Sequence, residues 1–366
     1  MSQLKIALVA HTNAPWTPHY ARFFLSRGHE VWLGSFAEDR VEGVQAVRLS
    51  SRAYHSGENQ HEYFTAAPRL RRLLRDFGPD VVFAPYILSN GLTASLAWRG
   101  PLVVSARGGD VLQQGERSNL QAFIQRQIVR RVCRRADAIH AVSAELVSAI
   151  ESLGIPSHKI SMFPVGVDVA RFPLASEPTP GPDGEVQIIC TRKQDHVYEN
   201  HVLIDALAIL RDRGRRFRCT MLAGGPLLEE RIRQANERGL ADRVDFRGNV
   251  AHDEVPGLIA SAQIYVSASS SDGTSSSLLE AMASGSFPVI SHIAANLDWV
   301  EEGRSGLFFP VGDASGLANQ LERAMDDAAL RAGARQLNRA RVEADASMQV
   351  NMSKLERMLI DAAAQS

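Results

Sequence analysis

The feature that most constrains the fold of this sequence is the regular alternation of short apolar runs with amphipathic segments. Each apolar run is followed by polar, Gly-containing sequence and then by apolar residues at helical spacing, as in Tyr20, Phe23 and Phe24. In the N-terminal half, the runs predict strands at 5–10, 30–33, 80–84, 102–105 and 138–142. Repeated strand–helix–strand order predicts an α/β fold with a parallel, doubly wound sheet that binds ligands at the carboxyl ends of its strands.

A cluster of Pro and Gly residues interrupts this alternation. Because the cluster is too rich in breakers for a helix or a strand, we interpret 172–185 as a linker. The alternation then restarts, with strands predicted at 186–191, 217–223, 244–247, 263–267 and 287–291. At 366 residues the chain suits two domains. We expect two Rossmann-like domains facing a cleft, residues 1–171 and 186–345, and a C-terminal helix at 346–366 that could cross back to the first domain.

The composition is that of a globular protein, at 45% hydrophobic and 22% charged residues. The net charge of −1 gives no general attraction to nucleic acid. Three scattered cysteines argue against a disulfide framework or a zinc site. Because no signal peptide follows the N-terminus, we expect a cytoplasmic location. Two uncharged stretches, 81–98 and 281–297, contain Gly, Ser, Asn and Pro, and we interpret both as buried α/β elements rather than membrane spans.

The most informative segment is 267–285, which reads SASSSDGTSSSLLEAMASG. It predicts a strand, a small polar loop and a helix. A helix N-terminus offers unpaired N–H groups and partial positive charge, so this arrangement favours a diphosphate cradle. Asp272 and Glu280 would accept hydrogen bonds from sugar and ribose hydroxyls. The alternative is structural, because Ser277 and Glu280 also fit a capping box, in which Glu280 bonds the N-terminus of its own helix.

The segment 271–290 resembles the signature of the family 4 retaining glycosyltransferases, which have the GT-B fold. That signature has two acidic residues separated by seven, running into Leu-Glu-Ala-Met-Ala-x-Gly-x-Pro-Val. Similar segments, at 27–31, 136–143, 164–172 and 244–250, extend the resemblance from about residue 5 to residue 325. The resemblance implies transfer of a sugar from a UDP- or GDP-sugar to a hydroxyl acceptor, in synthesis of a bacterial cell-surface polysaccharide, lipopolysaccharide or glycolipid.

The resemblance also assigns roles in the C-terminal domain. Glu280 would hold the nucleotide ribose, and Asp272, where a Glu is usual, would contact the transferred sugar. Arg192 would stabilise charge on the leaving diphosphate; without the resemblance, it reads as a solvated strand end. A family lysine is replaced by Val197, and Lys193 could substitute for it. The remaining donor-binding candidates are Gly224, Val250, Gly273, Thr274, Ser275, Ser276 and Ser277.

The candidates on the acceptor side lie in the N-terminal domain: His19, Arg107, Gly108, Gly109 and Asp110. The family often has His-Gly-x-Asp at the segment 107–110, and by this resemblance Asp110 would orient the acceptor. Arg107 replaces the His, which keeps a cation but loses a group that titrates near neutral pH. The alternative for 107–110 is an ordinary turn, and for His19 a simple helix-start residue. Asp110, Arg192 and Asp272 are the catalytic candidates.

No metal-binding or cofactor motif occurs in the chain, and Asp-x-Asp, which holds the metal in glycosyltransferases of the other main fold, is absent. We therefore expect a metal-independent enzyme with no cofactor besides its nucleotide-sugar substrate. Two alternatives remain. Asp272, Val197 and Arg107 depart from the family pattern and would suit a nucleotide-sugar-binding module without turnover. A GT-B sugar-nucleotide epimerase is the other.

Positive charge is concentrated in two amphipathic segments of the N-terminal half, Arg69 to Arg75 and Arg126 to Arg135. Basic amphipathic helices can rest on anionic lipid. Such contact would place the enzyme peripherally at the inner face of a membrane and suit a lipid-linked acceptor. The commoner explanation of such a segment is a solvated helix face.

Overall fold

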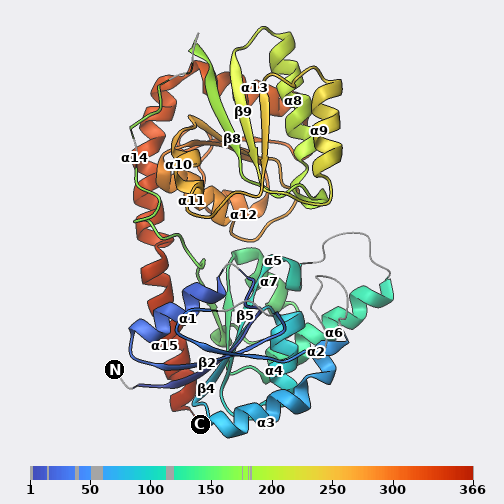
Figure 1. The fold of residues 1–366 in the computed structure, drawn as a ribbon, viewed down its shortest axis with the longest axis vertical. Coiled ribbons are helices and arrows are strands. Elements are labelled where there is room, and N and C mark those ends of the chain that lie inside the picture. Colours follow the sequence, from blue (N-terminus) through green and yellow to red (C-terminus); the bar gives the residue numbers. More distant parts are fainter. Residues whose placement is uncertain are drawn as a thin grey trace. The chain divides into compact units, whose positions relative to one another are not determined.

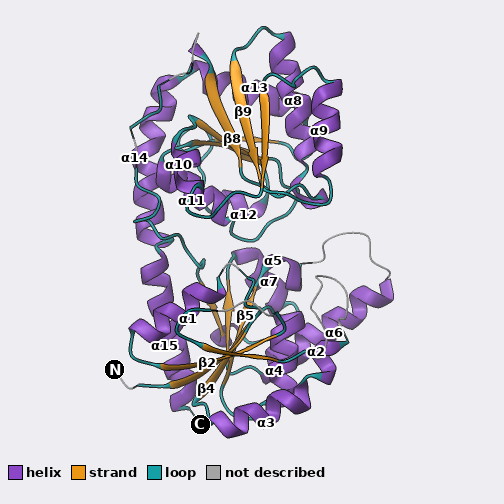
Figure 2. Cartoon of the chain, viewed as in Figure 1, coloured by secondary structure: helices purple, strands orange, loops and turns teal. Residues whose placement is uncertain are grey.

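The computed structural model describes residues 3–14, 16–37, 41–50, 61–112, 119–174, 176–179, 181 and 184–365, without the side chains of 45, 109, 110 and 119. The chain divides into two compact units. Unit 1 comprises Met1–Pro164 and Val350–Ser366, and unit 2 comprises Val165–Gln349. Each unit contains one parallel sheet covered by helices (Figure 2).

The sheet of unit 1 has seven parallel strands in the order β3-β2-β1-β4-β5-β6-β7. The strands are β1 (Lys5–Val9), β2 (Glu30–Ser35), β3 (Gln45–Arg48), β4 (Val81–Pro85), β5 (Leu102–Ala106), β6 (Ala138–Ala141) and β7 (Ile160–Met162). The helices are α1 (Thr17–Ser26), α2 (Glu62–Thr65), α3 (Ala67–Phe77), η1 (Ile87–Gly91), α4 (Leu92–Ala97), α5 (Gly108–Val111), α6 (Asn119–Arg135), α7 (Ala144–Glu151), η2 (Ser157–Lys159) and α15 (Met348–Ala364). The central strands β4 and β5 are buried at every residue because helices cover both faces of the sheet (Figure 1).

The sheet of unit 2 has six parallel strands in the order β10-β9-β8-β11-β12-β13. The strands are β8 (Val186–Cys190), β9 (Phe217–Leu222), β10 (Val244–Gly248), β11 (Ile264–Ser267), β12 (Phe287–Ser291) and β13 (Leu307–Phe309). The helices are η4 (His196–Tyr198), α8 (Asn200–Asp212), α9 (Leu228–Glu237), α10 (Val255–Ala260), α11 (Ser276–Ser284), α12 (Ala294–Leu297), α13 (Ala314–Asp326) and α14 (Ala328–Asp345). The strand order reverses between β8 and β11, and ligands bind at such switch points in open α/β sheets.

These two sheets confirm the expected fold class. Three strands were not predicted: β3, β7 and β13, which are edge strands of three or four residues. A run that short carries too little periodicity to be recognised in a sequence. The stretches 81–98 and 281–297 form strands and short helices, and no helix of the described residues is long and apolar enough to cross a membrane.

The boundary of the units differs from the expected one at 171. Unit 1 ends at Pro164 because Val167 and Phe172 are buried in a core cluster of unit 2. The expected linker, 172–185, therefore belongs to unit 2, although 175, 180, 182 and 183 lie outside the described residues. The C-terminal helix α15 belongs to unit 1 from Val350 onward.

Candidate functional site

The helix α11 begins one residue after Ser275, whose extended backbone makes it the N-cap. Its Oγ accepts a hydrogen bond from the backbone N–H of Leu278 at 3.3 Å. The capping-box alternative is therefore wrong: Ser277 lies inside the helix, and Glu280 lies too far along it to reach the N-cap. First-turn N–H groups have no acceptor within a helix, which leaves those of Ser276 and Ser277 for a ligand.

Arg192 follows β8 and reaches the residues that follow β11, so its contacts span the switch point of the sheet. Its Nη1 donates to Ser275 Oγ at 2.8 Å and to Ser277 Oγ at 2.9 Å, and its Nη2 donates to Asp272 Oδ2 at 2.5 Å. The guanidinium also lies 4.2 Å from the ring centre of Tyr198. With 8% of its surface exposed, Arg192 is not a solvated strand end, and that alternative is wrong.

The charge of Arg192 is fixed by its neighbours. Burial alone would lower the pKa of its guanidinium, but the Asp272 carboxylate, followed by Tyr265, outweighs burial and raises it. Tyr265 takes part through its hydroxyl, which lies 3.0 Å from Ser277 Oγ. Arg192 is therefore a permanent cation of the site, and its partners are the Asp272 carboxylate and the hydroxyls of Ser275 and Ser277.

Glu280 lies one turn into α11 and makes no hydrogen bond or ion pair with any residue that the structure describes. Burial raises the pKa of its carboxyl from the usual 4.5 to about 7, against the lowering influence of Arg171 and Arg192. A half-buried carboxyl with a raised pKa and no structural partner costs stability. Perturbed groups of this kind cluster at functional sites.

A cavity of about 390 Å³ adjoins Arg192 at the carboxyl ends of β8, β9 and β10. It is lined by Thr191, Arg192, Lys193, Tyr198, Ala223, Gly224, Gly225 and Asn249. Three of the predicted residues, Arg192, Lys193 and Gly224, thus lie together. Asn249 was not predicted; its Oδ1 accepts a hydrogen bond from the Gly224 N–H at 2.8 Å. Ala223 has a φ of 66°, which is rare outside glycine and occurs where strain serves a site.

Two buried amides, Gln194 and Asn200, fasten the loop that carries Arg192. The N–H of Gln194 donates to the Gly224 carbonyl at 2.9 Å. Asn200 Nδ2 donates to the Lys193 carbonyl at 3.1 Å and to Gln194 Oε1 at 3.0 Å. Gly225 is required beside this loop, because a Cβ there would lie 2.2 Å from the Gln194 carbonyl oxygen. These amides were not predicted, because a buried Gln or Asn carries no sequence motif of its own.

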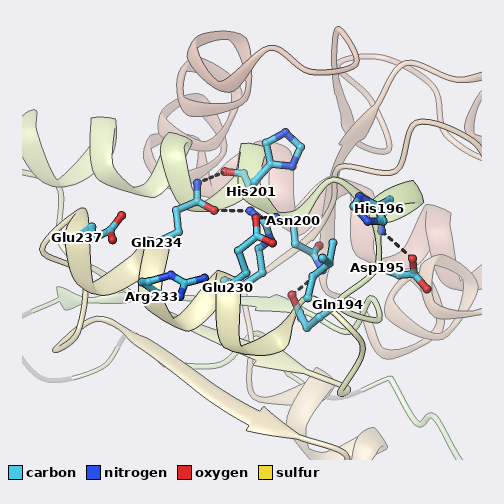
Figure 3. A pocket seen from close by; sticks show the side chains of 11 residues that line it. Gln194, Asp195, His196, Asn200, His201, Glu230, Arg233, Gln234 and Glu237 are labelled. Atoms are coloured by element: carbon cyan, nitrogen blue, oxygen red, sulfur yellow. Dashed lines mark hydrogen bonds and ion pairs between the residues drawn. The ribbon is translucent and has the colours of Figure 1, made fainter.

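A second cavity, of about 510 Å³, lies between the Arg192 loop, α8 and α9 (Figure 3). Its polar lining is largely paired with itself. Gln234 Nε2 donates to the His201 carbonyl at 3.1 Å, and Arg231 Nη1 donates to Gln234 Oε1 at 2.6 Å. Asp195 accepts from the His196 N–H at 2.8 Å. The first of these bonds joins α9 to α8, the second lies within α9, and the third lies within the loop.

The other predicted residues of unit 2 lie around the same loop. Gly273 is buried, Thr274 is half-buried, and Val250 packs against a core cluster beside Asn249. Lys193 is largely exposed, with its Nζ 3.7 Å from Asp195. Within the described residues, no group of three or more His, Cys, Asp or Glu side chains is placed to hold a metal ion.

The predicted residues of unit 1 follow β1 and β5. Arg107 is half-buried and donates a hydrogen bond to the Tyr20 hydroxyl. His19 is half-buried with its ring 6.0 Å from that of Trp16. The turn considered for 107–110 is a short helix, α5, from Gly108 onward. Gly109 and Asp110 lie on its backbone, but the side chain of Asp110 lies outside the described residues.

The fold itself is shared with solved glycosyltransferase structures. Sucrose-phosphate synthase from Thermosynechococcus elongatus matches with a TM-score of 0.85 at 18% identity, over 99% of this chain and 100% of that one. Anabaena HepE, solved in complex with UDP and glucose, matches with a TM-score of 0.80 at 17% identity, over 98% of this chain and 100% of that one. Two Rossmann-like units of this kind form the GT-B fold.

Two family models match the two halves of the chain. Residues 17–171 match the model described as Glycosyltransferase Family 4, and residues 186–327 match the model described as Glycosyl transferases group 1. The chain belongs to the family 4 glycosyltransferases.

Among curated relatives, the putative colanic acid biosynthesis glycosyltransferase WcaL of Salmonella typhimurium is 29% identical over 67% of this chain. This chain spans 59% of that relative's length. A GDP-mannose-dependent alpha-(1-6)-phosphatidylinositol monomannoside mannosyltransferase of Mycobacterium tuberculosis is 25% identical over 77% of each chain.

Proposed function

We propose that this glycosyltransferase moves a sugar, with retention of anomeric configuration, from a nucleoside diphosphate sugar to a hydroxyl acceptor, without a metal ion. The observation that carries the proposal is that two groups lie near the same switch point: a buried cation, Arg192, and a carboxyl, Glu280, that makes no hydrogen bond or ion pair with the described residues. These are the groups that a diphosphate and a ribose need. The UDP and glucose bound by the structural relative HepE fit the same chemistry.

Each residue has a separate part in donor binding. The N–H groups of Ser276 and Ser277 and the guanidinium of Arg192 would bind the diphosphate, and the ribose hydroxyls would donate to Glu280. Asp272 would exchange Arg192 for the hydroxyls of the transferred sugar. As the glycosidic bond breaks, charge develops on the diphosphate, where Arg192 and the helix N-terminus stabilise it. The leaving diphosphate then helps to deprotonate the attacking hydroxyl on the same face.

We further propose that the acceptor is lipid-linked and that the enzyme works from the cytoplasmic side of a membrane, in the synthesis of a cell-surface polysaccharide, lipopolysaccharide or glycolipid. The curated relatives support this class of product, since one is named for colanic acid and another for a phosphatidylinositol mannoside. Arg107, His19 and Asp110 remain the acceptor-side candidates.

The direct test incubates the protein with UDP- and GDP-sugars, in buffer containing EDTA, and follows nucleotide release with and without lipid-linked and soluble acceptors. Acceptor-dependent release of one nucleotide supports the proposal. Release at the background rate from every donor, despite measurable binding, would instead favour a nucleotide-sugar-binding module without turnover. Release that requires Mg²⁺ or Mn²⁺ would contradict metal independence. Interconversion of the donor without release would indicate an epimerase.

The variant Glu280→Gln distinguishes a role of Glu280 in donor binding from a role in the stability of the fold. The variant should lose donor affinity at least about tenfold, as for a lost charged hydrogen bond, and keep or gain thermal stability because a buried charge is removed. Glu229→Gln is the matched control, since Glu229 lies exposed on α9 in the same unit. Unchanged donor affinity in Glu280→Gln would refute the assignment.

A further inference from the structure

The amino-terminal end of α6 exposes a group of large apolar side chains. Leu120, Phe123 and Ile124 have exposed fractions of 67%, 59% and 48%. They are three of the eight large apolar side chains that are exposed in the described part of the chain. Because they are three and four residues apart, they lie on one face of the helix. Figure 1 shows this part of α6 at the margin of unit 1.

The same face continues into positive charge. Steps of three and four residues lead from Ile124 through Gln127 to Arg131 and Arg134, both exposed. Neither guanidinium has a hydrogen bond or an ion pair with a residue that the structure describes. The segment 119–135 contains no acidic residue at all. In contrast, Arg135 on the flank donates to the carbonyl of Gly100 at 2.6 Å and so has a structural use.

The other basic segment, Arg69 to Arg75 on α3, lacks the exposed apolar surface of α6. On α3 the apolar side chains Leu70 and Leu74 are fully buried in the core. Arg71 donates to the Leu96 carbonyl at 2.8 Å and so has a structural use. Arg69 and Arg72 are exposed, and α3 itself carries none of the exposed large apolar side chains in the described part of the chain. Of the two segments that the sequence offered for membrane contact, only α6 combines charge with exposed apolar surface.

We propose that the face of α6 from Leu120 to Arg134 docks on an anionic lipid bilayer. The apolar end enters the interface, and the two arginines contact lipid phosphates. Charge complementarity selects this occupant over a second copy of the chain, because a copy that docked through the same face would bring the same arginines and no carboxylate. The proposal rests on the proposed function only in that a lipid-linked acceptor would be met at this surface.

The test is flotation of the full chain with phosphatidylcholine vesicles that either contain or lack phosphatidylglycerol. Two variants probe the two parts of the face: Leu120→Ser/Phe123→Ser/Ile124→Ser and Arg131→Gln/Arg134→Gln. Each should partition onto anionic vesicles about tenfold more weakly than the wild type, given the usual contributions of apolar side chains and of arginines at a bilayer. Binding of the wild type should fall as salt is raised.

Arg69→Gln/Arg72→Gln is the matched control, with the same change of charge on a helix of the same unit. It should bind vesicles within about twofold of the wild type, because α3 itself exposes no large apolar side chain in the described part of the chain. Equal loss in both arginine pairs would mean that net charge alone drives binding, and absence of vesicle binding at low salt would overturn the proposal. The proposal would also be overturned if the wild type formed a dimer that binds no vesicles and the apolar variant did not form this dimer. Acceptor-dependent nucleotide release, with lipid-linked and soluble acceptors, is measured in parallel: if it is absent while docking persists, the proposed function fails and the surface stands.

Discussion

At the residue scale, the carboxyl of Glu280 predicts a pH dependence of donor binding. It accepts hydrogen bonds from hydroxyls best when ionised, and burial raises its pKa to about 7. Affinity for a nucleotide sugar should therefore rise about tenfold between about pH 6 and pH 8 and then level off. Calorimetric titration across this range measures it, and Glu280→Gln should show a flat profile. A rise that survives in the variant would assign the titration to another group.

The same group has the opposite effect on folding. Because its pKa in the folded chain is raised, the folded state holds a proton that the unfolded state has lost between about pH 4.5 and 7. The free energy of unfolding of the wild type, relative to Glu280→Gln, should fall over that window by up to about 3 kcal/mol. Denaturant titrations at several pH values test this sign.

Asp272 predicts a change that separates binding from transfer. Its Oδ2 lies 2.5 Å from Arg192 Nη2, so a diphosphate must compete with this carboxylate for the guanidinium. Asp272→Asn should bind the free nucleoside diphosphate several-fold more tightly, because the competing charge is gone. It should transfer sugar about 10²-fold more slowly, as for a lost transition-state contact. Equal weakening of both would instead mean that Asp272 only holds Arg192 in place.

At the scale of elements, the N-cap of α11 should serve stability and ligand binding together. Ser275→Ala removes the cap, at a cost of about 1 kcal/mol, and also one of the three partners of Arg192. Ser143→Ala is the matched control, because Ser143 caps α7 with a similar bond of 3.4 Å to Leu146. Thermal unfolding should show comparable losses in both variants, and only Ser275→Ala should weaken binding of nucleotide. If the two variants bind nucleotide equally well, the hydroxyl of Ser275 has no part in the site.

The donor-side elements could be read from the sequence because their signal is local. The strand, polar loop and helix from Ser267 to Gly285 follow one another along the chain, and small residues and a closing glycine mark them. The supports of Arg192 could not, because Ser275 and Asp272 are remote from it in sequence and only strand order brings them together. Gln194, Asn200 and Asn249 are ordinary amides until their carbonyl and N–H partners are known.

At the scale of the whole molecule, a buried ion cluster holds α15 to unit 1. Glu356, 3% exposed, accepts from Arg27 Nε at 3.2 Å and lies 2.9 Å from His29 Nε2. Burial would raise the pKa of Glu356, but the hydrogen bonds from Arg27 and His29 outweigh it and lower the pKa. Its contribution to stability is therefore present above about pH 4.5 and is lost as pH falls below that value.

Glu356→Ala should lower the free energy of unfolding by about 3 kcal/mol at neutral pH, because it removes the buried carboxylate that both Arg27 and His29 contact. Chemical denaturation followed by circular dichroism measures the loss. Glu343→Ala is the control, since Glu343 forms an ion pair that is half-exposed on α14. The assignment fails if the two variants are equally stable.

The doubly wound sheets could be predicted from the sequence, but the limits of the two units could not. Repeated strand–helix order fixes a doubly wound sheet because buried parallel strands need apolar residues on both faces. The limits of the units were not predictable, because Val167 and Phe172 look like any apolar residues before a proline-rich segment. Only packing shows that they belong to unit 2.

Both ends of the described chain fold into unit 1, with unit 2 inserted between them. On the ribosome, unit 2 is therefore complete while unit 1 still lacks α15. The first 164 residues must wait for their closing helix about ten seconds or more, at synthesis rates of about 5–20 residues per second. Throughout that interval Arg27 and His29 lack the Glu356 carboxylate that they contact in the folded chain, so the segment made first is the last to complete its fold.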